Sequence, residues 1–177
     1  TTLFKSRWFP FRIHSELKKA IVEKKHATFH LHGGWIPVFS SLARLFAKHQ
    51  IKFVLTPHGA YNTLAMKKNS LLKKFYFRFF EKQLIQKAHK IHSIGKSEIT
   101  GLNSIYKNAN NFLLPYGFDF EESSELFLKN DSFTIGFVGR LDTYTKGLDL
   151  LVEAFYEFQK SQPNSKLWII GDGDGRL

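Results

Sequence analysis

The sequence contains no cysteine and only one methionine among its 177 residues. Without cysteine, disulfide bonds, thiolate zinc sites and a thiol nucleophile are all excluded. No apolar run reaches the roughly 18 residues of a membrane-spanning helix, and no charged-then-apolar leader is visible. We therefore expect neither a membrane span nor a secretion signal. Because the chain begins at Thr1, we also expect that a further segment precedes it.

Acidic residues are scarce and unevenly placed. Residues 1–117 contain 20 lysines and arginines but only 4 acidic residues, a balance of +16, whereas residues 118–177 contain 6 and 11, a balance of −5. The sign changes just after Pro115-Tyr-Gly117, which predicts a domain boundary between residues 117 and 118. The basic half has three interpretations: a solvated surface, attraction to an anionic membrane, and nucleic-acid binding. No nucleic-acid motif accompanies the charge, so we expect no nucleic-acid partner.

Strands and helices are predicted to alternate along the first 117 residues. Short apolar runs predict strands, and apolar residues at helical spacing predict helices between them. This alternation is typical of a doubly wound parallel α/β sheet. The predicted strands are 27–31, 51–55, 90–94 and 112–114, and the predicted helices are 14–25, 35–49, 71–88 and 96–106.

The predicted helix 71–88 has two distinct faces. One is apolar, with Leu72, Tyr76, Phe80 and Leu84 in line and Leu71, Phe75 and Phe79 beside them. The other is a basic stripe made of Lys67, Lys74, Arg78 and Lys82. Two interpretations stay open: a core helix with a solvated outer face, and an amphipathic helix that contacts a membrane and leaves Phe77 exposed.

A βαβ unit is predicted after residue 132. Residues 133–138 and 167–170 have the pattern of buried strands, and apolar residues after Gly147 recur at helical spacing. The loop between them places Arg140 and Lys146 beside a helix start, where unpaired N–H groups and the helix dipole favour anions. We predict a diphosphate site there. The structural alternative is an ion pair between Arg140 and Asp142.

Four motifs, in this order, resemble those of the retaining glycosyltransferases of family four, which have the GT-B fold. They are Phe53-Val-Leu-Thr-Pro-His-Gly59, Leu113-Leu-Pro-Tyr-Gly-Phe-Asp119, Gly139-Arg-Leu141 with Lys146-Gly147, and Gly171-Asp-Gly173. Tyr116 stands where the family usually has asparagine. The resemblance implies an α/β, GT-B-like chain of two Rossmann-like doubly wound parallel-sheet domains, both incomplete here. Residues 1–117 would be the acceptor-side domain, lacking its first βα unit, and residues 118–177 the first part of the nucleotide-sugar domain.

The resemblance also implies roles for individual residues. His58 would reach the donor sugar across the cleft between the domains, against the alternative of a loop histidine bonded only to backbone. The donor diphosphate would bind at Gly139, Arg140, Lys146 and Gly147. Further donor or acceptor loops would contain Gly33, Gly34, Gly59, Gly171 and Gly173.

No metal and no cofactor are expected. His30, His32 and His58 match zinc ligands by type only, since no carboxylate is near them in sequence. Asp172-Gly-Asp174 matches the sequence of a D-x-D metal motif, but it falls in the strand-end turn of the family. Cationic side chains and a helix terminus would replace a metal ion at the leaving diphosphate.

The carboxylate pair that the family has about a hundred residues beyond the Lys-Gly loop is absent before Leu177. We therefore expect a hexosyltransferase-like enzyme that is truncated at both ends and inactive as this piece. The expected function is transfer of a sugar from a nucleotide-sugar to a cell-surface or lipid-linked glycan, as in polysaccharide, capsule or lipopolysaccharide synthesis. The expected location is cytoplasmic, peripheral on the inner face of the plasma membrane. The alternative is an inactive relative that at most binds nucleoside diphosphate or anionic membrane.

Overall fold

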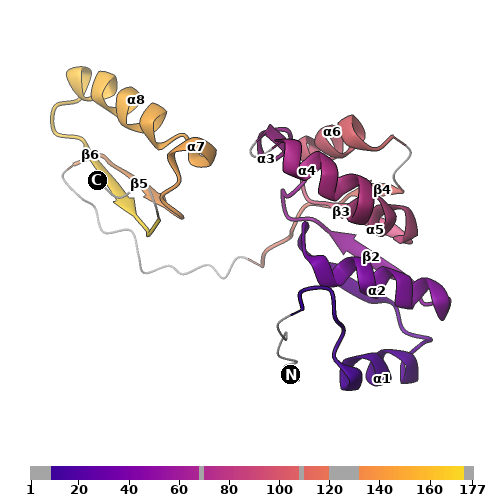
Figure 1. Ribbon diagram of the computed structural model, residues 1–177. Helices are drawn as coiled ribbons and strands as arrows, with labels where there is room; N and C mark the ends of the chain where they lie inside the picture. Colours follow the sequence, from indigo (N-terminus) through magenta and orange to yellow (C-terminus); the bar gives the residue numbers. More distant parts are fainter. Residues whose placement is uncertain (1–8, 68–69, 108–109, 120–131, 174–177) are drawn as a thin grey trace. The chain divides into compact units, whose positions relative to one another are not determined.

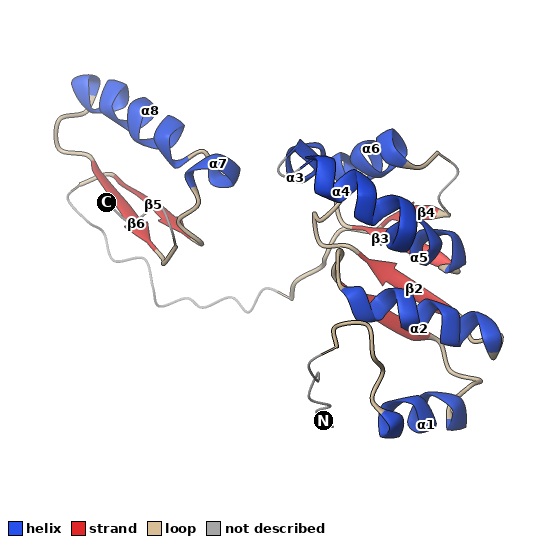
Figure 2. Ribbon diagram, in the orientation of Figure 1, coloured by secondary structure: helices blue, strands red, loops and turns tan. Residues whose placement is uncertain are grey.

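The computed structural model describes residues 9–67, 70–107, 110–119 and 132–173. The chain divides into two compact units, Thr1–Phe118 and Asp119–Leu177. Both consist of parallel strands connected through helices, so the fold class is α/β, as predicted. Figure 1 labels most of the elements, and Figure 2 distinguishes helices from strands. Among the described residues, no helix is both long and apolar enough to cross a membrane.

Unit 1 contains a four-stranded parallel sheet. Its strands are adjacent in chain order, β1-β2-β3-β4, with Leu31 opposite Leu55 and Leu55 opposite Ile91. Because parallel crossovers are right-handed, an order without reversal puts the connecting helices on one face. The described strands therefore lack the reversal of a doubly wound sheet. The elements are α1 (Ser15–Glu23), β1 (Phe29–His32), α2 (Pro37–Lys48), β2 (Phe53–Thr56), α3 (Thr63–Lys67), α4 (Ser70–Tyr76), η1 (Phe77–Glu81), α5 (Lys82–Lys87), β3 (Lys90–Ser93), α6 (Lys96–Ile105) and β4 (Asn111–Leu113).

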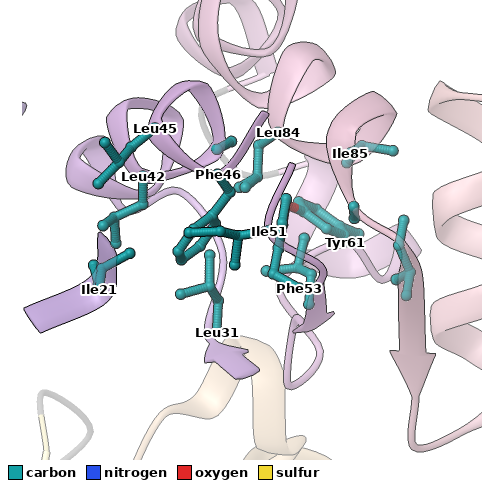
Figure 3. Close-up of a cluster of buried hydrophobic side chains, with 14 of the residues drawn as sticks. Ile21, Leu31, Leu42, Leu45, Phe46, Ile51, Phe53, Tyr61, Leu84 and Ile85 are labelled. Atoms are coloured by element: carbon teal, nitrogen blue, oxygen red, sulfur yellow. The ribbon is translucent and has the colours of Figure 1, made fainter. Parts of the chain in front are cut away.

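The core of unit 1 lies between this sheet and its helices. Alternate strand residues such as Leu31, Phe53 and Leu55 are buried against apolar residues of α2 and α5. Figure 3 shows Phe46 of α2 and Leu84 of α5 within this cluster, with Tyr61 beside them. Because strand side chains alternate between faces, the intervening residues of each strand lie on the other face of the sheet.

The predicted helix 71–88 is interrupted by a π-helical turn. This turn, η1, separates α4 from α5 and carries Glu81, whose side chain is fully buried. Phe77, which the membrane-contacting interpretation left exposed, is partly buried and packs against the core. This detail of the membrane-contacting interpretation was wrong, because Phe77 contributes to the core of unit 1. The exposed aromatic side chains of this segment are Phe75 and Phe79.

Unit 2 contains β5 (Thr134–Val138), α7 (Thr143–Lys146), α8 (Leu148–Ser161) and β6 (Lys166–Ile170). The two strands are parallel, with Thr134 opposite Lys166 and Val138 opposite Ile170, as the predicted βαβ unit requires. The short helix α7 was not predicted; Asp142 caps it by accepting from the N–H of Thr145 at 3.1 Å. Gly147 then has a φ of 64°, a left-handed conformation that ends α7 and allows α8 to start in a new direction.

Candidate functional site

His58 lies in the loop that follows β2, at the carboxyl end of the sheet. Its φ of 52° is in the left-handed region, where a non-glycine residue is uncommon, and Gly59 follows with a φ of 81°. The N–H of Gly59 donates to the carboxylate of Glu98, a buried residue of α6. The same carboxylate accepts from the N–H of Ile94 at 2.7 Å. Glu98 therefore holds the unusual backbone conformation that presents His58.

Three side chains from three strand ends form a hydrogen-bonded row. His58 Nε2 lies 2.9 Å from His32 Nδ1, and His58 Nδ1 lies 2.9 Å from the hydroxyl of Tyr116. His32 ends β1, His58 follows β2 and Tyr116 follows β4. Both ring nitrogens of His58 thus contact side chains, so the alternative of a loop histidine bonded only to backbone is wrong.

A second row of hydrogen-bonded groups crosses the sheet from β1 to the exit of β4. The Nε2 of His92 lies 2.6 Å from the carbonyl oxygen of Leu114, which can only accept, so this nitrogen carries the hydrogen. With a neutral ring, His92 Nδ1 accepts from the hydroxyl of Thr56 at 3.1 Å. Thr56 in turn accepts from His30 Nε2 at 2.5 Å. This row connects the exit of β4 to β1.

Burial is the largest cause that lowers the pKa of His30, and the imidazoles around it lower this pKa further. A neutral His30 can act as the first donor of the row through Nε2. No cluster of three or more metal-ligating side chains occurs among the described residues. The histidines at this edge of the sheet bond to each other, to hydroxyls and to the carbonyl oxygen of Leu114.

Gly33 and Gly34 lie in the loop after β1, packed against the loop after β2. A Cβ on Gly34 would lie 2.6 Å from the Cβ of Ala60, so the backbone of one loop meets a side chain of the other where only glycine fits. Trp35 follows with a φ of 61°; its backbone N–H donates to Glu81 at 2.8 Å and its indole N–H to the carbonyl of Ala60 at 2.9 Å. These contacts join the Gly33-Gly34 loop to the His58 loop.

The predicted diphosphate residues lie in the loop after β5 in unit 2. Arg140 is exposed, and its guanidinium is 3.0 Å from the carboxylate of Asp142. The structural alternative for Arg140 is therefore present without excluding a ligand, because a guanidinium has five N–H donors. Lys146 is exposed at the end of α7, directly before Gly147 and the start of α8.

Gly171 and Gly173 brace this loop by packing against residues 139 and 141. The N–H of Gly139 donates to Ile170 at 3.0 Å, and that of Leu141 donates to Asp172 at 2.9 Å. A Cβ on Gly171 would lie 1.8 Å from the carbonyl oxygen of Gly139, and one on Gly173 would lie 2.5 Å from that of Leu141. Both glycines thus have a packing role in the structure, whatever ligand contact they make.

The predicted membrane-facing cations are only partly described. Lys74, Arg78 and Lys82 are exposed on the segment α4-η1-α5. Lys67 ends the separate helix α3, and its side chain lies outside the described residues. Apolar side chains are exposed on the same segment: Leu71, Leu72, Phe75 and Phe79. We call these four residues the apolar face of α4-η1.

Several residues that shape the site were missed in the sequence. Glu81 and Glu98 reach the two loops from helices, and Thr56 and His92 build the second row. The sequence held one signal: residues 1–117 have only four acidic residues, so each glutamate in that half is unusual. Nothing in the spacing of His92 distinguished it from a packing residue.

Comparison with known proteins places the second unit in a family. The profile of the family described as "Glycosyl transferases group 1" matches residues 118–177. Residues 118–177 are therefore similar to the group 1 glycosyltransferases, as the motifs predicted. A relative is the alpha-monoglucosyldiacylglycerol synthase of Acholeplasma laidlawii, 49% identical over 49 residues. The match covers 28% of this chain and 12% of the relative, so only a small part of that protein is compared.

Proposed function

We propose that the protein containing this sequence is a retaining, metal-independent glycosyltransferase of the GT-B type. It would transfer a sugar from a nucleotide-sugar to a lipid-linked or cell-surface glycan acceptor. The observation that carries this proposal is the loop after β5. Two exposed cations, Arg140 and Lys146, lie there beside the start of a 14-residue helix, within the segment that matches the family.

The chemistry of the leaving group supports this assignment. Cleavage of a sugar–diphosphate bond leaves additional negative charge on the nucleoside diphosphate. Arg140 can bind two phosphate oxygens with its planar fork, and Lys146 adds a compact positive charge. Free N–H groups at the start of α8 add partial positive charge. While no diphosphate is bound, the hydrogen bond to Asp142 would orient the guanidinium of Arg140.

Unit 1 would provide His58 and the loops of Gly33, Gly34 and Gly59 for the donor sugar and the acceptor. The imidazole of His58 lies at the carboxyl end of a parallel sheet, where α/β proteins bind ligands. The left-handed φ of 52° at His58 is a strained conformation of the kind that is concentrated at functional sites.

A lipid acceptor is favoured by two further observations. The relative's name describes synthesis of a glucosylated diacylglycerol. The apolar face of α4-η1 is exposed next to Lys74, Arg78 and Lys82, an arrangement typical of helices that lie in a membrane surface. We therefore propose that this segment faces anionic lipid on the inner side of the plasma membrane.

The test is a transfer assay with the protein that contains this sequence. Radiolabelled UDP-glucose, UDP-galactose and GDP-mannose would each be offered with vesicles that contain diacylglycerol and anionic phospholipid. We expect label in the lipid fraction with one of these sugars, retention of the anomeric configuration, and a loss of at least a hundredfold with His58→Ala. Binding of nucleoside diphosphate without any transfer would instead favour a non-catalytic relative.

A further inference from the structure

The two nitrogens of His58 are contacted from opposite sides by His32 and Tyr116. Both distances are 2.9 Å, and the ring centroids are 5.2 Å apart for His32 and 6.0 Å apart for Tyr116. A neutral imidazole has one N–H and one acceptor nitrogen. The two neighbours of His58 therefore determine together which nitrogen carries the hydrogen.

Tyr116 is the residue that can make this choice. A phenol is a much better donor than acceptor, so its O–H donates to His58 Nδ1. His58 must then carry its hydrogen on Nε2, and it donates to Nδ1 of His32. The second nitrogen of His32 is left as the outer end of the row.

The position of Tyr116 is itself fixed by the second row. His92 donates to the carbonyl of Leu114 at 2.6 Å, and the N–H of Leu114 donates to Ser93 at 3.0 Å. Leu114 is two residues before Tyr116, so the backbone that carries the phenol is held at the end of β3. Tyr116 is also two residues from Phe118, where unit 1 ends.

We propose that Tyr116 and His32 are positioning residues for His58: Tyr116 fixes its tautomer, and both residues fix the orientation of its ring. Tyr116 determines that Nε2 of His58 carries the hydrogen, and His32 accepts it. The consequence for catalysis rests on the role proposed above for His58, whereas the hydrogen-bonded row can be tested without it.

The tautomer can be measured directly. Long-range ¹H–¹⁵N correlation spectra of the ¹⁵N-labelled protein, recorded at a pH where the imidazoles are neutral, distinguish a protonated nitrogen from an acceptor nitrogen. We expect His58 to show a single tautomer with hydrogen on Nε2. Tyr116→Phe should move both ring ¹⁵N shifts of His58 toward averaged values, because the donor to Nδ1 is lost. Tyr106→Phe removes a hydroxyl elsewhere in unit 1 and should leave the ring ¹⁵N shifts of His58 unchanged.

A second variant separates the two neighbours. His32→Ala leaves Tyr116 in place, so His58 should keep its hydrogen on Nε2 while the ring becomes more mobile. Unchanged ring shifts in Tyr116→Phe would overturn the proposal. So would a change of tautomer in His32→Ala alone, because His32 would then be the residue that sets the tautomer.

Transfer kinetics then connect the row to function. Tyr116→Phe should lower kcat roughly tenfold or more with little change in KM for the nucleotide-sugar, as expected when a reacting group is misplaced. A changed tautomer with unchanged kcat would support the positioning of His58 by Tyr116. It would at the same time contradict the role of His58 in the proposed function, so the two failures are distinguishable.

Discussion

The hydroxyl of Tyr61 donates to the carboxylate of Glu81 at 2.5 Å inside unit 1, and both side chains are fully buried. Burial raises the pKa of Glu81, although the bonds from Tyr61 and from the N–H of Trp35 lower it in part. Burial also raises the pKa of Tyr61 well above its usual value, with Glu81 as a further cause. The other carboxylate oxygen, Oε2, has no hydrogen-bond partner among the described residues. Folding therefore shifts the carboxyl group of Glu81 toward its neutral form.

This burial predicts a pH dependence of stability. An acid whose pKa is raised by folding stabilises the protein below its unfolded pKa of about 4.3, and this contribution is lost as pH rises through the folded pKa. Glu81→Gln keeps an oxygen for Tyr61 and Trp35 but cannot ionise. We expect its free energy of unfolding, relative to wild type, to increase as pH rises from 4 to 8. Urea unfolding at several pH values measures this difference, and Glu23→Gln, an exposed glutamate of α1, is the control.

Glu81→Ala should be destabilising at every pH. The buried donors of Tyr61 and Trp35 would lose their partner, which costs about 1–3 kcal/mol per group. If Glu81→Gln lost as much stability as Glu81→Ala at pH 8, the carboxyl group would be needed in its ionised form, contrary to this account.

A second prediction concerns Gly171, which packs against the loop of the proposed diphosphate site. Gly171→Ala places a methyl group on the carbonyl oxygen of Gly139, so the loop must shift. We expect a loss of about 1–3 kcal/mol in stability, the usual range for overpacking. We also expect weaker binding of UDP or GDP by calorimetry. Gly136→Ala is a matched control in β5, because nothing lies within 4 Å of its added Cβ. Equal stability of the two variants would contradict the bracing role.

A third prediction concerns the cations of that loop. In the protein that contains this sequence, Arg140→Ala and Lys146→Ala should each cost about 2–4 kcal/mol of transition-state stabilisation, the range for one preorganised donor. The measurement is kcat/KM for sugar transfer. Lys166→Ala removes an exposed lysine at the start of β6, at the opposite end of the strand pair, and should leave the rate unchanged. Wild-type rates in both loop variants would refute the diphosphate assignment.

A fourth prediction is that chelation does not affect transfer. Arg140, Lys146 and the start of α8 would already supply the positive charge that a metal ion brings to a leaving diphosphate. The assay is the initial transfer rate before and after dialysis against excess EDTA. Complete loss of activity that added Mg²⁺ or Mn²⁺ restores would rule out the metal-independent mechanism.

A fifth prediction concerns the membrane. Replacing Lys74, Arg78 and Lys82 by Gln should weaken sedimentation with anionic vesicles roughly a hundredfold, since each cation near the surface contributes about 1 kcal/mol. Binding of the wild type should also fall as salt rises, because the attraction fades within a Debye length of about 8 Å at physiological ionic strength. Neutral vesicles should bind the wild type weakly.

A matched triple variant tests whether position or charge alone matters. Lys18, Lys19 and Lys24 are exposed in and just after α1, and their replacement by Gln removes the same charge from a place without exposed leucines or phenylalanines nearby in sequence. We expect this control to keep most of its binding. Equal release of the two triples would show that the apolar face of α4-η1 has no special role.

The sequence predicted the alternation of strands and helices well, because that alternation depends on local periodicity. Every strand predicted from an apolar run is present within two residues at either end. The π turn at Phe77–Glu81 was missed, since a single inserted residue leaves an apolar pattern nearly unchanged. Winding in two directions was predicted from the alternation and from the resemblance; the described strands show no reversal, and strand order depends on tertiary pairing that alternation does not specify.

The candidate site divides in the same way. The motifs found the loops of His58 and Arg140, which lie at strand ends as expected. Partners could not be predicted, because they depend on register between distant segments: His58 and Tyr116 are 58 residues apart, and Thr56 and His92 are 36 apart. The packing of the strands, and not any local sequence pattern, decides whether two such side chains meet at the edge of the sheet.

The burial of Glu81 and Glu98 also affects how the protein will behave in purification. Residues 1–117 have four glutamates and no aspartate, so only Glu16 and Glu23 remain on the surface against 20 lysines and arginines. A cation exchanger should retain the protein more strongly than its net charge of +11 suggests. Cellular polyanions should adhere to this half of the chain during lysis in dilute buffer. A wash at high ionic strength is therefore needed before any affinity for a nucleotide or a lipid is measured.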